Sequence, residues 1–266
     1  METPDSEAPK KNDPEPTSPG GSLGDGGKPE VSTVRTVAKN LRKLIQRPPV
    51  GKANLGDLRS TTPFSRAWGF HRGEPIDRYY IEKFMSEHRD SIAGACLEIG
   101  DTRYIDQFKN DAIQSIDVLH CAEGYPSVTI VGDLVDAPHI EADQFDCIIC
   151  TQTLQYVSNP LAAVETMRRI LRPGGVILIT VPCISQRDQD AGSDWVDKWR
   201  FTTAGMQDLL SGCFDVGDKV NIGSYGNVLS AVAFLHGMSH DEFTQEELET
   251  HDDMFELIVT ATVRKT

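Results

Sequence analysis

Residues 145–181 read FDCIICTQTLQYVSNPLAAVETMRRILRPGGVILITV, and this stretch decides the fold. It opens with an apolar run of strand length, Phe145 to Thr151, and closes with a second one, Val176 to Val181. Between them Asn159-Pro160 is a helix start signal, and apolar residues then recur at helical spacing. The breaker Arg172-Pro-Gly-Gly175 ends that helix. A buried strand, a helix and another buried strand in this order predict a parallel sheet.

The alternation of strands and helices continues on both sides of this stretch. Apolar runs predict strands over residues 95–100, 116–119, 128–131 and 255–263, with an extended stretch near Val220, and helical spacing predicts helices over 75–85, 203–210 and 228–236. The fold class is therefore α/β, with a Rossmann-like, doubly wound and mostly parallel sheet.

The chain divides into three segments by composition. Residues 1–30 contain six prolines, five glycines and no aromatic residue, which predicts a disordered tail. Residues 31–72 hold a basic amphipathic helix over 31–46 and then a lid-like segment, and the α/β domain occupies 73–266. We expect the basic helix to dock on the acidic body, a protein partner or a second copy of the chain in a homodimer, in preference to a membrane surface.

Charge and cysteine usage exclude several classes of protein. The net charge of −14 argues against binding to nucleic acid, which needs a basic surface. Apolar runs such as Val176 to Cys183 are too short to span a bilayer, and no apolar signal core is present, so we expect a cytoplasmic protein without a transmembrane segment. The six cysteines are expected to be free thiols. Cys147 and Cys150 point to opposite faces of one strand, so we expect no metal there.

Polar residues gather where the predicted strands end, which is where an open parallel sheet binds its ligand. Glu98-Ile-Gly-Asp101, Asp117, Gly132-Asp-Leu134 and Thr151-Gln152 close the first four strands. Gly100 lets the backbone approach a ligand, Asp117 can accept from both hydroxyls of a ribose, and an acid at position 133 can accept from an exocyclic amine, which selects adenine. The alternatives are that Asp101 and Asp133 only form turns and that Glu98 only binds backbone groups.

The sequence resembles the class I S-adenosylmethionine-dependent methyltransferases over about residues 73–266. The resemblance rests on Leu97-Glu-Ile-Gly100, Gly132-Asp-Leu134, the segment from Phe145 to Tyr156 and Arg169-Ile-Leu-Arg-Pro-Gly-Gly175. A narrower similarity, to a bacterial subgroup associated with glycan or natural-product biosynthesis, rests on Arg72-Gly-Glu-Pro-Ile-Asp-Arg-Tyr-Tyr80, Trp199-Arg-Phe-Thr202, Gly226-Asn227 and Phe234-Leu-His-Gly237.

The resemblance implies a seven-stranded sheet with an antiparallel last strand and S-adenosyl-L-methionine as the cofactor. It places Gly100 beside the methionine part, Asp117 on the ribose, Asp133 on the adenine amine, and Gln152 to Tyr156 beside the sulfur. The candidate cofactor-binding residues are Glu98, Gly100, Asp101, Asp117, Val118, Asp133, Leu134, Thr151, Gln152 and Tyr156. For the substrate, Trp195 and Trp199 are candidates to stack on a sugar or ring and Arg200 to clamp a carboxylate or phosphate, or to pair with an acid instead.

One departure from the family bears on cofactor binding. The family repeats glycine in its first turn, whereas this chain has Thr102 and Tyr104 at the second and third positions. Three hypotheses therefore stay open: methyl transfer to a small molecule or glycan, a non-catalytic methyltransferase-like scaffold, and a nicotinamide-dependent oxidoreductase. The absence of a Gly-x-Gly-x-x-Gly turn makes the third the weakest. His71, His120 and His236 are candidate bases by residue type only, and no catalytic base is assigned.

Overall fold

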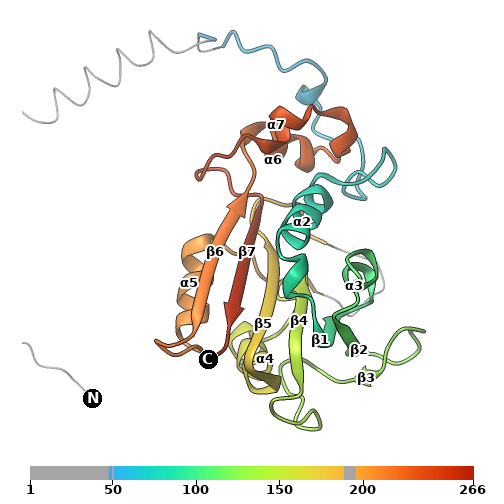
Figure 1. Cartoon of the computed structure of the whole chain (residues 1–266). Helices are drawn as coiled ribbons and strands as arrows, with labels where there is room; N and C mark the ends of the chain where they lie inside the picture. Colours follow the sequence, from blue (N-terminus) through green and yellow to red (C-terminus); the bar gives the residue numbers. More distant parts are fainter. Residues whose placement is uncertain (1–47, 50, 189–195) are drawn as a thin grey trace, which may run out of the picture. The chain divides into compact units, whose positions relative to one another are not determined.

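Seven strands form one sheet at the centre of residues 58–266 (Figure 1). The computed structural model describes residues 48, 49, 51–188 and 196–266, and it separates the chain into units 1–57 and 58–266. The predicted tail over 1–30 and the predicted helix over 31–46 lie outside the described residues. A short 3-10 helix, η1 (Gly56–Arg59), spans the boundary between the two units.

The sheet has the predicted, mostly parallel arrangement. Its strands run in the order β3-β2-β1-β4-β5-β7-β6. Strand β7 runs antiparallel to β5 and β6 on its two sides, and all other neighbouring pairs are parallel. The strands are β1 (Gly94–Ile99), β2 (Ile113–His120), β3 (Ile130–Val131), β4 (Phe145–Thr151), β5 (Leu171–Pro182), β6 (Lys219–Tyr225) and β7 (Ile258–Arg264). The seven-stranded, α/β prediction with an antiparallel last strand is therefore confirmed.

Helices cover the two faces of the sheet. The helices are α2 (Ile76–Glu87), α3 (Arg103–Gln107), α4 (Pro160–Ile170), α5 (Thr203–Ser211), α6 (Val228–Leu235) and α7 (Gln245–Glu249), with 3-10 turns η2 (Arg89–Ser91) and η3 (His240–Glu242). One core packs α4 and α5 against the sheet, and the other packs α2, α3, α6 and α7 against the opposite face. Figure 1 shows α6 and α7 beyond the carboxyl end of β6, so this pair extends past the sheet at the edge where ligands bind.

Helix starts follow the sequence signals. Asn159 accepts a hydrogen bond from the Ala162 backbone N–H at 3.3 Å and caps α4, with Pro160 in its first turn. The predicted breaker is only partly right, because α4 ends at Ile170 and residues 171–175 already belong to β5. Gly174 there has φ +82°, a left-handed conformation that glycine adopts without a steric penalty.

The strand β4 separates its two cysteines as predicted. Cys147 packs in the core on the α2 side and Cys150 in the core on the α4 side, and both are free thiols. Within the described part of the chain, no group of three or more potential ligands could hold a metal ion. No helix in that part is long and apolar enough to cross a membrane.

A buried carboxylate ties the first strand to the helix that follows it. Glu98 is 1 % exposed, and its two oxygens accept hydrogen bonds from the Tyr104 and Ile105 backbone N–H groups at 3.0 and 2.9 Å. These N–H groups lie in the first turn of α3 and have no partner within the helix. Burial raises the pKa of Glu98 to about 8, and the two hydrogen bonds act in the opposite direction.

We predict that Glu98→Gln changes the pH dependence of stability. The pKa of about 8 in the folded state exceeds that of an unfolded glutamate, about 4.3, so between these values the folded wild type holds a proton that the unfolded chain releases. The wild type should therefore lose roughly 1 to 3 kcal/mol of unfolding free energy relative to the variant between pH 5 and pH 9. Urea unfolding at a series of pH values measures this difference, and a constant difference contradicts the prediction.

Candidate functional site

The turns after the parallel strands meet at one edge of the sheet. Gly100 follows β1, Asp133 follows β3, and Thr151 and Pro182 end β4 and β5. Gly100 has φ +105°, and a Cβ added to it would meet nothing within 4 Å. The first turn therefore needs its glycine for backbone conformation, and it leaves open space beside the turn.

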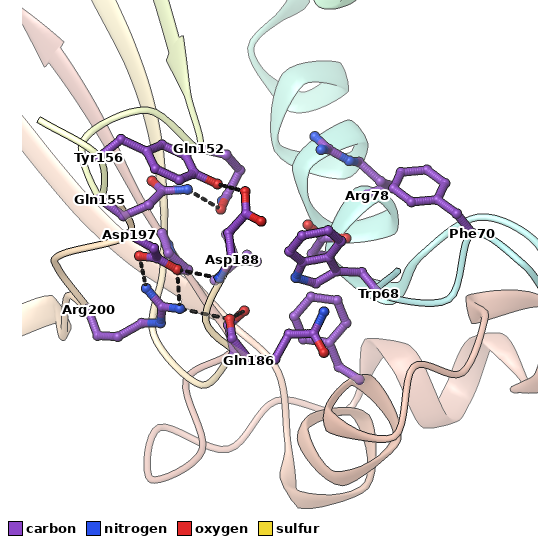
Figure 2. Close-up of a pocket in the computed structure, with 15 residues that line it drawn as sticks. Trp68, Phe70, Arg78, Gln152, Gln155, Tyr156, Gln186, Asp188, Asp197 and Arg200 are labelled. Carbon is purple, nitrogen blue, oxygen red and sulfur yellow. Dashed lines mark hydrogen bonds and ion pairs between the residues drawn. The ribbon is translucent and has the colours of Figure 1, made fainter. Parts of the chain in front are cut away.

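A cavity of about 160 Å³ lies at this edge, beyond the carboxyl ends of β4 and β5. Ligand pockets for whole drug-sized molecules usually measure about 300 to 1,000 Å³, so this cavity can enclose part of such a ligand or a small one. Figure 2 shows two facing walls, with Trp68, Phe70 and Arg78 on one side and Gln152, Gln155 and Tyr156 on the other. The predicted residues that line it are Gln152, Tyr156 and Arg200.

The wall formed by the end of β4 has a strained backbone. Gln152 has φ +46°, although a residue with a side chain rarely adopts a left-handed conformation, and its N–H donates to Thr180 O at 2.8 Å. Gln155 Nε2 donates to Gln152 Oε1 at 3.4 Å, which leaves Gln152 Nε2 and Gln155 Oε1 buried without a hydrogen-bond partner. Strain of this kind costs about 1 to 3 kcal/mol and is typical of functional sites.

Two aspartates, Asp188 and Asp197, accept hydrogen bonds from the Tyr156 and Arg200 side chains that line the cavity. Tyr156 donates to Asp188 Oδ2 at 2.8 Å, and burial raises the pKa of this tyrosine. Arg200 donates to both oxygens of Asp197 at 2.5 and 2.6 Å, and also to Gln186 O at 2.7 Å. The structure therefore realises the second of the two interpretations of Arg200, in which it pairs with an acid.

The candidate tryptophans do not form the cavity wall. Trp199 is 42 % exposed, donates from Nε1 to Val157 O at 2.9 Å and does not line the cavity. Trp195 lies outside the described residues. The aromatic residues that do line it are Trp68, Phe70, Tyr156 and Phe234.

The wall formed by Trp68 and Phe70 belongs to the predicted lid-like segment, and it is held against the loop after α6. The Phe64 and Ser65 N–H groups both donate to His236 O, at 2.8 and 3.2 Å. Gly237 has φ +68°, and a Cβ there would lie 2.0 Å from Ser65 O. This close backbone approach fixes residues 64–72 over the strand ends.

Two charged residues in the first turn of α2 complete this wall, and neither is among the site residues predicted from the sequence. Asp77 is 8 % exposed and Arg78 is partly exposed, and both line the cavity. Asp77 Oδ1 and Arg78 Nε are buried without a hydrogen-bond partner. Both residues lie in the Arg72 to Tyr80 motif, which carries part of the family resemblance. The spacing of residues in this motif does not distinguish Asp77 and Arg78 as site residues.

Several predicted residues occupy other places. Asp117 lies three residues before the end of β2 at His120, not at the strand end, and its Oδ1 accepts from Thr129 Oγ1 at 2.7 Å. Strand β2 continues beyond Asp117 because Val118 and Leu119 are buried in the core. Asp101 and Asp133 accept from the N–H groups of Arg103 and Val135 at 2.9 Å, the geometry of turn-forming residues, and Leu134 is buried in the core.

Tyr104 does not fill the open space beside the first turn. Its side chain is 2 % exposed and packs in the core beneath α2, where its hydroxyl accepts a hydrogen bond from Arg78 Nη1 at 2.9 Å. Thr102 occupies the N-cap position of α3, where its side chain makes no capping hydrogen bond, and it is partly exposed. Tyr104, the larger of the two residues that replace glycines of the family's first turn, therefore points into the protein.

The three candidate histidines do not line the cavity. His71 Nδ1 lies 3.1 Å from Ser65 Oγ, His120 Nδ1 lies 3.0 Å from both the N and the O of Ala122, and the His236 ring contacts Phe64. Each histidine is placed by its local structure, so the structure adds no support for any of them as a base.

Comparison with known proteins identifies the family. A family model described as a methyltransferase domain matches residues 59–211, more than half of the chain. The chain belongs to this methyltransferase domain family, and its fold is that of the class I S-adenosylmethionine-dependent methyltransferases. A comparison with curated proteins finds no match.

Several solved structures of similar fold are described as methyltransferases, and their sequence identity to this chain is low. A protein of this kind from Mesorhizobium loti has a TM-score of 0.47 and 14% identity, over 71% of this chain and 98% of its own. Another from Archaeoglobus fulgidus has a TM-score of 0.48 and 8% identity, over 71% and 94%. The plantazolicin methyltransferase BamL, in complex with a triazolic desmethylPZN analog and SAH, has a TM-score of 0.48 and 14% identity, over 75% of this chain and 88% of its own.

We predict that Gly237→Ala releases the segment over the cavity. The new Cβ would overlap Ser65 O, so residues 64–72 must move away, and the protein should lose about 2 kcal/mol or more of stability. Hydrogen exchange of residues 64–72 and thermal unfolding measure the two effects. The matched control is Gly124→Ala, which has φ +96° and open space, and should speed exchange only locally. Equal exchange at residues 64–72 in both variants contradicts the account.

Proposed function

We propose that this protein transfers a methyl group from S-adenosyl-L-methionine to an oxygen or nitrogen atom of a small molecule or glycan. The observation that carries the proposal is the walled cavity at the carboxyl ends of β4 and β5, because four of the residues that line it, Asp77, Arg78, Gln152 and Gln155, each have a buried polar atom without a hydrogen-bond partner. Unpaired buried polar groups are costly, so the site is built to receive a polar ligand.

The residues of the first turn fit the cofactor. The space beside Gly100 is open, and Tyr104 is turned into the core, so the two features that could block a ligand at this edge are absent from the described structure. The backbone of the turn at Gly100 is proposed to contact the cofactor. Asp133 is proposed to accept a hydrogen bond from the adenine amine, and Asp117 from the ribose hydroxyls. Asp117 has the weaker support, because β2 carries it three residues before the strand end.

The residues of the cavity are proposed to align the reactants. When bound, S-adenosylmethionine supplies a methyl group that is activated by the positive charge on its sulfur. The rings of Trp68 and Phe70 exclude water and offer apolar faces on which a sugar or ring can stack, and the amide of Gln152 is held toward the acceptor by its fixed backbone. Alignment of two reactants is worth several kcal/mol of the barrier, about 7 to 11 in well-oriented model reactions.

A non-catalytic scaffold is the second candidate. The observation that favours it is the pairing of Arg200 with Asp197, because this guanidinium group is then not free to clamp an anionic acceptor. An oxidoreductase has weaker support, since the first turn lacks the glycine spacing of nicotinamide-binding proteins. Ligand binding separates the three, with S-adenosylhomocysteine and NAD titrated by calorimetry into the full chain. Binding of the first alone, in the micromolar range, is expected; binding of neither to folded protein overturns the methyl-transfer proposal.

We predict that Gly100→Ala weakens S-adenosylhomocysteine binding by about tenfold or more, because the added methyl group occupies the space beside the first turn. Gly174→Ala is the matched control, since Gly174 also has a positive φ and open space but lies at the start of β5, away from this edge. Both variants should lose a similar stability, about 1 kcal/mol. Calorimetric titration of both variants measures the affinity, and an equal loss of affinity in the two would count against the site.

A further inference from the structure

The first turn of α2 carries two charged side chains, each of which has one buried polar atom without a hydrogen-bond partner. Asp77 is more than nine-tenths buried, and its Oδ1 has no hydrogen bond. The Nε atom of Arg78 likewise has no hydrogen-bond partner. Among the described residues, no ion pair involves either side chain. The two side chains attract each other as opposite charges, but the unpaired atoms of the buried carboxylate and of the partly buried guanidinium group can still gain hydrogen bonds from a ligand that brings the opposite charges.

The other residues of the same motif are committed to the fold. Pro75 forms a β-bridge with Ser239, and Ile76 is buried in the core. Tyr79 donates to Glu249 Oε1 at 2.6 Å, and Tyr80 donates to Leu248 O at 2.9 Å. Within this motif, Asp77 and Arg78 are the two cavity-lining residues, and each keeps a buried polar atom without a hydrogen-bond partner.

Tyr104 sets the position of Arg78. The Tyr104 hydroxyl accepts from Arg78 Nη1 at 2.9 Å, while the Tyr104 backbone N–H donates to Glu98 at 3.0 Å. The residue that replaces a glycine of the family's first turn therefore anchors the arginine, which lines the cavity and keeps an Nε without a hydrogen-bond partner. Burial raises the pKa of the Asp77 carboxyl, which agrees with a site that offers this group little solvation.

Resting on the proposed function, we propose that Asp77 and Arg78 bind the amino-acid end of the cofactor, with the ammonium group at Asp77 and the carboxylate at Arg78, and that Tyr104 positions Arg78 for this contact. The chemistry is complementary, because an α-amino-acid headgroup carries adjacent opposite charges that match the two side chains. The amino terminus of the twelve-residue α2 also favours a carboxylate. In this chain helix α2 takes over a contact that the first turn, with Thr102 and Tyr104, does not offer.

The test compares two ligands that differ only in the amino-acid part. S-adenosylhomocysteine carries that part, whereas 5′-methylthioadenosine has the same nucleoside and thioether without it. Calorimetry on the full chain should show that Arg78→Gln and Asp77→Asn weaken S-adenosylhomocysteine binding by about ten- to a hundredfold. The same variants should leave 5′-methylthioadenosine binding within about twofold. Tyr104→Phe removes only the hydroxyl and should weaken S-adenosylhomocysteine binding by about three- to tenfold.

Control variants separate this role from a structural one. Arg89 is exposed in η2, just after the same helix, and donates to Lys109 O at 3.4 Å, so Arg89→Gln should change neither affinity. Circular dichroism establishes that each variant is folded. Equal losses for both ligands, or no loss for either, overturn the inference while leaving the proposed function in place. A wild type that binds neither ligand overturns the proposed function, and the inference with it.

Discussion

The hydrogen bonds of the buried Glu98 carboxylate are the interaction on which the site depends. They hold the amino terminus of α3 directly against the end of β1, through the N–H groups of Tyr104 and Ile105. This arrangement leaves Gly100 at an open turn and sends the Tyr104 side chain into the core, where it contacts Arg78. One buried acid therefore decides which side of the first turn is free for a ligand and which side is filled.

The cavity is assembled from segments that are far apart in the chain. Residues 64–72 cross the strand ends because their backbone packs on the turn at Gly237, and this contact is possible only without a side chain there. Helix α2 follows and brings Asp77 and Arg78 to the same space, opposite the strained end of β4 at Gln152. The strand ends supply the usual edge for ligand binding in an open sheet, and these two segments convert that edge into an enclosed site.

Local sequence signals were sufficient for the fold. The segment from Phe145 to Val181 carries its own strand, cap and helix signals, so β4, α4 and β5 were predicted closely. Gln152 and Tyr156, which the sequence offers as cofactor-binding candidates after β4, line the cavity. Asp117 was misplaced relative to the strand end because burial of Val118 and Leu119 extends β2 beyond it. Asp77 and Arg78 could not be selected, since their role depends on unpaired atoms and on contacts with residues distant in sequence.

The central claim is that the edge beside Gly100 and Arg78 holds an S-adenosyl ligand although the family's repeated glycines are replaced. A crystal structure of the full chain grown with S-adenosylhomocysteine tests it most directly. The account predicts density for the ligand along the first turn, with its carboxylate within about 3 Å of an Arg78 nitrogen. Density for the ligand at any other place, or a well-ordered Gly100 turn without ligand at saturating concentration, would contradict it.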